Sequence, residues 1–227
     1  MLKTFRAPLA LLLLLAAAIT AAPAGTRPSA RNVPQAPQPA PIVDSKMSEP
    51  KAFDGLDPAC PAEIRDRQKL VEVTYYSDDG KVHQGQLVLD SELEQDVKKV
   101  FEVALRERTP IHSVIPVSHT RFRKGGRWDD NLSMEANNTS SFNYRPKTGG
   151  GSLSVHAYGR AIDINPLINP YIKGRNVQPR GAKYRPRVPG TLTADHPIVR
   201  AFVALGWEWG GSWTSLKDYQ HFEKPRR

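Results

Sequence analysis

Two short polar motifs in the second half of the sequence constrain the fold most strongly. Residues 154–164 read Ser-Val-His-Ala-Tyr-Gly-Arg-Ala-Ile-Asp-Ile, and residues 218–223 read Asp-Tyr-Gln-His-Phe-Glu. Together they offer His156, Asp163 and His221 as ligands of one metal ion. A zinc ion with three protein ligands keeps a fourth position for water, which is typical of a catalytic site. We therefore expect the chain to fold so that the two motifs meet, and the ligand set points to hydrolysis.

The spacing inside the first motif predicts its local geometry. An odd separation would put His156 and Asp163 on opposite faces of a continuous strand. His156 is therefore expected on a turn that leads into a strand ending near Ile164. Gly159 fits such a turn, because a residue without Cβ lets the backbone bend or approach the metal closely.

The second motif offers a proton acceptor. Asp218 and His221 lie on one side of the chain only in a turn or a helix. There Asp218 can take a proton from water without being a ligand, or it can orient a histidine ligand. Glu223 is an alternative base, since on a strand it shares a face with His221. Arg145, in Asn-Tyr-Arg-Pro, is our candidate for stabilising an oxyanion, with a plain surface arginine as the alternative. Lesser candidates for this role are Arg121, Arg123 and Arg127.

Residues 1–24 predict a secretory signal peptide. Lys3 and Arg6 precede the apolar run of residues 7–22, and Ala-Pro-Ala at 22–24 offers small residues for cleavage. The run is shorter than the roughly 20 residues of a spanning helix, and an uncleaved anchor is the alternative. We expect an exported protein of the periplasm, cell envelope or extracellular space, with no stable membrane span after cleavage.

Composition predicts one folded domain behind a tether. Residues 25–52 are rich in Pro and Ala and poor in large apolar residues, so they are expected to form a flexible linker. Residues 53–227 are long enough for a single core and are expected to form the metal-binding domain as a monomer. Cys60 is the only cysteine, so no internal disulfide can form. Burial of this thiol is favoured over an intermolecular bond.

Hydrophobic periodicity predicts an α+β domain. Alternating apolar residues around the turn signal at 77–80 favour a hairpin, and apolar spacings of three and four favour helices. Trp207, Trp209 and Trp213 are expected to fill the core rather than line a cleft. The predicted elements are strands at 70–76, 82–89, 111–117 and 207–209, helices at 91–108 and 197–205, and an ordered loop at 120–153.

The formal charge of +9 has a local origin. The loop from Lys173 to Arg187 carries six cationic residues and no acidic one. A basic protein would suit nucleic acid, but export argues against that partner. We expect no nucleic acid, and anionic cell-envelope polymers or lipid headgroups are the expected partners of this loop. A merely solvated loop is the alternative.

The motifs resemble those of the zinc D-alanyl-D-alanine carboxypeptidase and L-alanyl-D-glutamate endopeptidase family, which includes vancomycin-resistance dipeptidases and phage endolysins. The likeness is specific in residues 154–164, in Trp-Gly-Gly-x-Trp at 209–213 and in residues 218–222, and it extends over about residues 60–227. It implies a single-domain α+β fold, shared with the hedgehog signalling domain, in which an antiparallel sheet flanked by helices carries the zinc.

The resemblance also implies roles for single residues. His156, Asp163 and His221 correspond to the Zn²⁺ ligands, Asp218 to the catalytic base, and Arg145 to the arginine of a Tyr-Arg-Pro element near the scissile carbonyl. The dipeptidase branch has Glu where this chain has Asp218, whereas Asp is similar to the endopeptidase branch. Tyr-Arg-Pro also lies closer to the first zinc ligand here than in the dipeptidases. The bond that is cleaved therefore stays open between these two types.

We expect an exported zinc metallopeptidase that hydrolyses amide bonds in the stem peptides of peptidoglycan. A hypothesis from another class is a non-catalytic, zinc-stabilised module for cell-wall binding or signalling. Asp218 beside His221 argues against it, because a binding module needs no proton acceptor there.

Overall fold

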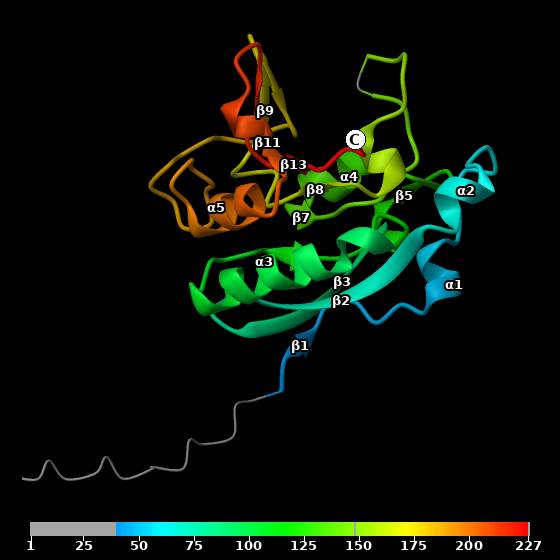
Figure 1. Ribbon diagram of the computed structural model, residues 1–227, viewed down its shortest axis with the longest axis horizontal. Helices are drawn as coiled ribbons and strands as arrows, with labels where there is room; N and C mark the ends of the chain where they lie inside the picture. The colour runs from blue at the N-terminus through cyan, green and yellow to red at the C-terminus, as the bar shows by residue number, and fades with distance from the viewer. Residues whose placement is uncertain (1–39, 148, 227) are drawn as a thin grey trace, which may run out of the picture. The chain divides into compact units, whose positions relative to one another are not determined.

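The computed structural model describes residues 40–147 and 149–226 (Figure 1). The expected signal peptide, and the expected linker as far as residue 39, lie outside the described residues. Helices and several small sheets make up the described part, so the α+β class is confirmed. No helix in this part is long and apolar enough to cross a bilayer.

The secondary-structure elements are short apart from one hairpin and one helix. The α-helices are α1 (Glu49–Ala52), α2 (Ala62–Arg65), α3 (Glu94–Arg106), α4 (Asp130–Glu135) and α5 (Pro197–Ala204). The strands of the first half are β1 (Ile42–Val43), β2 (Gln68–Tyr76), β3 (Val82–Asp90), β4 (Ser113–Val114), β5 (Arg123–Lys124), β6 (Arg127–Trp128) and β7 (Asn138–Thr139). Those of the second half are β8 (Ala161–Asp163), β9 (Tyr171–Lys173), β10 (Asn176–Gln178), β11 (Glu208–Trp209), β12 (Lys217–Asp218) and β13 (His221–Glu223).

The hairpin of β2 and β3 is the longest piece of sheet and confirms the predicted strand pair. The two strands pair in register from Gln68 opposite Asp90 to Tyr76 opposite Val82. Along β2, the buried residues Val71, Val73 and Tyr75 alternate with exposed ones, as expected for a strand with one face on the core. The sequence pattern therefore identified this hairpin correctly.

Helix α3 covers the hairpin and confirms the predicted helix. Asp90 accepts a hydrogen bond from the Glu92 amide at 3.1 Å, which caps the short 3₁₀ helix that leads into α3. The apolar face of α3 is buried in one core with residues of β2, β3, β8, α5, β11 and β13. Figure 1 shows α3 lying along β2 and β3, with α5 beside it. The core thus joins the hairpin to the strands that carry the second motif.

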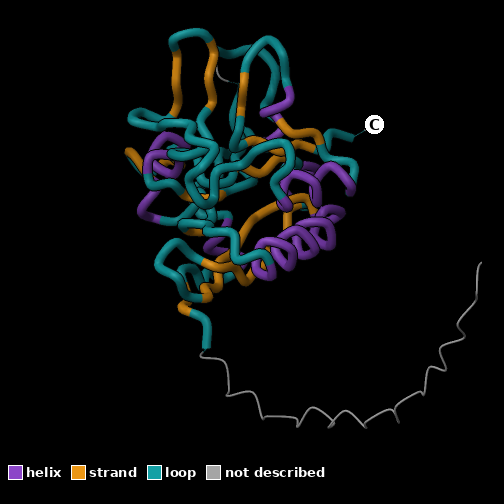
Figure 2. The backbone as a smooth tube through the Cα atoms, turned by 90° about the vertical axis from the view of Figure 1, so that its left-hand side faces the viewer, coloured by secondary structure: helices purple, strands orange, loops and turns teal. Residues whose placement is uncertain are grey.

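The β-structure is divided among small sheets rather than gathered in one antiparallel sheet. The three-stranded sheets have the orders β1-β3-β2, β10-β9-β12 and β11-β13-β8 (Figure 2). Two pairs, β1 with β3 and β4 with β7, are parallel. The expected strand at 111–117 is reduced to β4, because prolines at 110 and 116 cannot donate to a ladder.

The segment at 120–153, expected as a loop, contains short elements. Helix α4 begins there because the Asp129 side chain accepts hydrogen bonds from the amides of Asn131 and Leu132. Strands β5 and β6 form a two-stranded hairpin just before it. The prediction missed these elements because each is too short to show a periodic pattern.

The structure also revises the expected end of the linker. Residues 42–52, assigned to the linker by composition, contain β1 and α1. Ser45 donates a hydrogen bond to Gln86 Oε1 at 2.7 Å, and Ala52 is fully buried beside Val88 and Phe142. A few well-placed contacts therefore order a stretch whose composition alone favours disorder.

Candidate metal centre

Asp163 and His221 come together because their strands pair. Strands β8 and β13 are antiparallel, and Asp163 lies directly opposite His221. Opposed residues on neighbouring strands project from the same face and lie within contact distance. Strand β13 also pairs with β11 on its other side. The sheet thus fixes two of the three predicted ligands next to each other.

His156 reaches the same place from a 3₁₀ helix, Val155–Tyr158. The Ser154 hydroxyl accepts a hydrogen bond from the His156 amide at 3.3 Å, and Gly159 ends the helix with φ 64°. The expected turn before a strand is therefore confirmed. The bend expected at Gly159 is present as its left-handed φ. The glycine also lets the turn pack against β2, because a Cβ there would collide with Gln68 Oε1.

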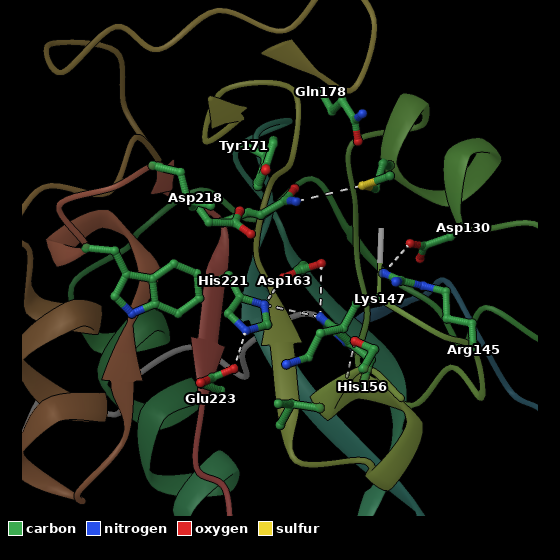
Figure 3. A pocket seen from close by; sticks show the side chains of 16 residues that line it. Asp130, Arg145, Lys147, His156, Asp163, Tyr171, Gln178, Asp218, His221 and Glu223 are labelled. Atoms are coloured by element: carbon green, nitrogen blue, oxygen red, sulfur yellow. Dashed lines mark hydrogen bonds and ion pairs between the residues drawn. The ribbon is translucent and has the colours of Figure 1, made fainter. Parts of the chain in front are cut away.

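The three predicted ligands converge on one point. His156 Nε2 lies 3.2 Å from His221 Nδ1 and 3.3 Å from Asp163 Oδ2. His221 Nδ1 lies 3.0 Å from Asp163 Oδ1. One ligand atom from each residue lies within 4.8 Å of the others, and all three residues are buried (Figure 3). The structure therefore brings together the set that the motifs selected.

The outer nitrogen of each imidazole is held by a group that can only accept a hydrogen bond. His156 Nδ1 lies 2.7 Å from the Ser141 carbonyl oxygen, and His221 Nε2 lies 3.0 Å from Glu223 Oε2. Both outer nitrogens therefore carry the proton, which leaves lone pairs on the two inner nitrogens. Two lone pairs and a carboxylate facing each other repel, unless a cation or an extra proton lies between them. The donor set thus fits a divalent zinc ion, which binds neutral imidazole and carboxylate.

The pKa shifts of Asp163 and His221 also show that positive charge stabilises this cluster. Burial alone would raise the pKa of Asp163, but the neighbouring imidazoles of His156 and His221 outweigh it and hold that pKa far below its usual value. Burial alone would lower the pKa of His221, but the hydrogen bonds that its ring donates to the Asp163 and Glu223 carboxylates raise it to about 10. Without a metal ion the cluster retains a proton on His221. A metal ion would displace that proton, so binding would release it.

Asp218 stands next to this cluster on β12 and is not one of its three donors. Strand β12 pairs with β9, and a turn at Tyr219 and Gln220 leads from it to His221 in β13. Asp218 Oδ1 is buried and has no hydrogen-bond partner among the described residues. Burial raises the pKa of Asp218 to about 7, with the positive His221 opposing the shift and Asp163 adding to it. Figure 3 shows its carboxylate directed toward the three ligands. The turn that the spacing required is therefore present.

Glycine at position 210 makes room for Asp218. A Cβ on Gly210 would lie 2.6 Å from the Asp218 carbonyl oxygen and 2.8 Å from its Cβ. Real Cβ contacts are longer than this, so only glycine allows β12 to approach so closely. The first glycine of Trp-Gly-Gly-x-Trp thus positions the candidate base.

A cavity of about 370 Å³ opens onto the cluster. Arg145 lines it and pairs with Asp130, with 2.6 Å between Nη2 and Oδ2. Figure 3 shows Arg145 and Asp218 on opposite sides of the three ligands. The lining residues are Asp130, Met134, Arg145, Lys147, Ser154, Val155, His156, Asp163, Tyr171, Gln178, Trp213, Leu216, Asp218, Gln220, His221 and Glu223. Arg145 therefore lies in the wall of the cavity that opens onto the three ligands.

Sequence reasoning missed several residues of this cavity. The Trp213 ring lies 5.5 Å from that of His221, whereas Trp207 and Trp209 are buried in the core as expected. The position of Trp213 two residues beyond Gly-Gly, near the second motif, was the available signal. Asp130 gave no such signal, because its partner Arg145 is distant in sequence and the helix that carries it is short.

The alternative base and another candidate oxyanion donor are held by other partners. Glu223 binds the outer nitrogen of His221, so it orients a ligand instead of facing the ligand cluster. Arg123, a lesser candidate, donates to the Ser118 carbonyl oxygen and pairs with Asp54. It is absent from the lining of the cavity.

Cys60 is only partly buried, and it has no disulfide partner. It packs at the edge of the small cluster around Ala52 and Phe142. Burial raises the pKa of this thiol, which keeps it protonated.

Comparison with known proteins assigns the region that carries the site. Residues 148–224 match the family described as D-alanyl-D-alanine carboxypeptidase. The match includes His156, Asp163, Asp218 and His221 and leaves Arg145 just outside it. It supports the family predicted from the motifs. No solved structure matches the chain significantly.

Proposed function

We propose that the protein is an exported zinc metallopeptidase acting on the stem peptides of peptidoglycan, and the match of residues 148–224 to the D-alanyl-D-alanine carboxypeptidase family supports this proposal. The family match supports a peptidase. The zinc dependence, the substrate and the export are our proposals. So are the hedgehog-like form of the fold and the position of the zinc on the sheet of β8 and β13.

One observation carries the proposal. Two imidazole lone pairs and one carboxylate of a buried cluster face each other at 3.0 to 3.3 Å. Such an arrangement is unfavourable unless positive charge lies between the three groups. Because the cluster opens to a cavity, it has room for water and substrate. A closed structural site would have a fourth protein ligand instead.

The residues of the chain divide the work as follows. His156, Asp163 and His221 would hold the zinc ion, which supplies Lewis-acid chemistry when bound. Asp218 accepts the proton of the attacking water at Oδ1, which has no competing hydrogen bond among the described residues. It then delivers this proton to the nitrogen of the departing amine.

Arg145 supports the substrate from the other side. Its guanidinium donates hydrogen bonds to the carbonyl oxygen as negative charge develops there. Asp130 holds the guanidinium at 2.6 Å, which reduces the conformational freedom it would lose on binding. Lys147 also lines the cavity and adds a second cation. Two cations suit a substrate that carries free carboxylates, as stem peptides do.

Which bond is cleaved follows from the products. Purified protein is incubated with muropeptides, with and without a chelator, and the products are identified by mass. Loss of D-alanine would indicate a carboxypeptidase, and separation of L-alanine from D-glutamate would indicate an endopeptidase. Chelator-sensitive hydrolysis supports the proposal, and hydrolysis that persists after removal of all metal contradicts it.

A variant tests the ligand set directly. His156→Ala is expected to lose stoichiometric zinc, measured by elemental analysis, together with hydrolysis. Stoichiometric zinc in this variant would contradict the ligand set. Zinc binding without hydrolysis of any muropeptide by the unaltered protein would favour the non-catalytic binding module instead.

A further inference from the structure

Six exposed cationic residues close together in the sequence have no role in the proposed reaction. They occur in residues 164–194, which contain no aspartate or glutamate. We call them the basic strip, and they are Lys173, Arg175, Arg180, Lys183, Arg185 and Arg187. The nearest acids along the chain are Asp163, a predicted metal ligand, and Asp195.

The strip is exposed and electrostatically unpaired. All six side chains belong to exposed residues. Within residues 40–147 and 149–226, none of them forms an ion pair or a side-chain hydrogen bond. Some cations elsewhere in the described fold are paired: Arg160 pairs with Asp90 at 2.9 Å, and Lys224 pairs with Asp96 at 2.8 Å. A run of unpaired like charges repels itself, and a polyanion relieves that repulsion.

The strip begins beside the catalytic cavity. Lys173 ends β9, and Arg175 follows in the tight turn to β10, which is centred on Gly174. The same two strands place Tyr171 and Gln178 in the cavity wall. In Figures 1 and 2 the hairpin of β9 and β10 projects from the rest of the described fold. A ligand lying on the hairpin would therefore continue directly from the substrate in the cavity.

Beyond the hairpin, the strip has a recess of its own. A cavity of about 310 Å³ is lined by Lys183 and Arg185 together with Leu167, Ile168, Gly181 and Val188. Its lining contains two cations and no acidic side chain. An ammonium and a guanidinium that share a recess match the oxygens of a phosphate group.

We propose that the basic strip binds a phosphodiester polymer of the cell envelope, and so holds the peptidase on polymer-bearing wall next to its peptide substrate. The proposal rests on the proposed function only for the identity of that substrate. The charge pattern fits a polymer better than a membrane surface. Within residues 164–194, the exposed large hydrophobic residues are Val177 and Val188. Two valines do not form the broad apolar face that inserts into a bilayer.

The test compares two variants with equal loss of charge. The strip variant is Arg175→Gln, Lys183→Gln and Arg185→Gln, all outside the catalytic cavity. The control variant replaces three exposed lysines that form no ion pair with a described residue, namely Lys46→Gln, Lys51→Gln and Lys99→Gln. Binding to poly(glycerol phosphate) is measured by calorimetry at low salt and at 0.5 M salt. Neutral dextran and phosphatidylglycerol vesicles serve as the other probes.

The strip variant is expected to bind poly(glycerol phosphate) at least about tenfold more weakly than the control variant at low salt, because each cation near an anionic surface contributes on the order of 1 kcal/mol. High salt is expected to reduce the difference by screening. Both variants should hydrolyse a soluble muropeptide alike, while the strip variant should digest polymer-bearing wall more slowly.

Three results would overturn the proposal. They are equal polymer binding by the two variants, binding of the unaltered protein to dextran as strong as to the phosphate polymer, and binding to vesicles alone. The last result would identify a membrane surface as the partner. Polymer binding is measured without catalysis, so a protein that hydrolyses no muropeptide would refute the proposed function and leave this result to stand by itself.

Discussion

Replacing Asp218 by Asn is expected to lower kcat and to raise the stability of the metal-free protein at neutral pH. The substitution keeps the size of the side chain and removes its negative charge. Asp218 Oδ1 makes no hydrogen bond with a described residue, so the substitution breaks none at that atom. A base removed from a proton transfer costs on the order of 100-fold to 10,000-fold in kcat. Zinc content is expected to stay stoichiometric, because Asp218 is not a ligand.

Stability is expected to change in the opposite direction. Burial raises the pKa of Asp218 from 3.8 to about 7, so ionisation of this carboxyl opposes folding. The penalty is absent below pH 3.8, where the carboxyl is protonated in both states, and it is complete above pH 7. At about 1.4 kcal/mol per pKa unit, it approaches about 4 kcal/mol for the metal-free protein. A bound cation would reduce the penalty by stabilising the carboxylate.

The assay therefore has two measurements. The first is hydrolysis of a muropeptide by zinc-loaded protein. The second is thermal unfolding of chelated protein between pH 4 and pH 8. Asp218→Asn should unfold at the same temperature as the unaltered protein at pH 4 and at a higher temperature at pH 8. The control, Asp66→Asn, removes an exposed carboxylate and should change neither measurement markedly.

Two results would refute this reasoning. If Asp218→Asn retained full kcat, Asp218 would not be the base. If the variant unfolded at a lower temperature than the unaltered protein at pH 8, the carboxylate would stabilise the fold, and the effect of its burial would have been misjudged.

Three further substitutions probe the support of the site. Glu223→Gln should weaken zinc affinity by about 10-fold to 100-fold without abolishing it, because the amide orients His221 less firmly; competition with a chelator measures this, and unchanged affinity would contradict the role. Gly210→Ala should lower kcat and leave zinc content intact, since a Cβ there displaces β12, which carries Asp218. A kcat equal to that of the unaltered protein would show that β12 accommodates the Cβ without moving Asp218 out of place. Asp130→Asn should lower kcat more than it raises KM, because Arg145 loses the 2.6 Å partner that positions it for the developing oxyanion; steady-state kinetics with unchanged kcat would argue against positioning by this pair.

The ligand cluster could be predicted because its chemistry is strict. Few side chains bind zinc, and the offsets among His156, Asp163 and His221 restrict the local backbone. The strands that bring them together are only three residues long, so their pairing partners could not be read from the sequence. The long hairpin of β2 and β3 could be predicted, since β2 alternates between buried and exposed residues over much of its length and a turn signal at residues 77–80 follows it.

Other parts of the fold depend on contacts between distant residues. Residues 42–52 have a disordered composition, yet Ser45 and Ala52 find partners on the hairpin and its neighbours. The Arg145–Asp130 ion pair is a second example, because the local sequence around either residue does not predict its partner. Trp213 lies at the cavity while Trp207 and Trp209 enter the core, and composition does not distinguish these environments.

Strand β13 lies between β11 and β8, and it carries a ligand whose partners are far away along the chain. A zinc ion shared by β8 and β13 would act as a cross-link that closes a long loop, and such links lower the entropy of the open state. The amides of these strands should therefore exchange with deuterated solvent much faster once the metal is withdrawn, while those of the β2 and β3 hairpin change least. Metal supply would then control the lifetime of this half of the molecule under proteolysis as well as its turnover.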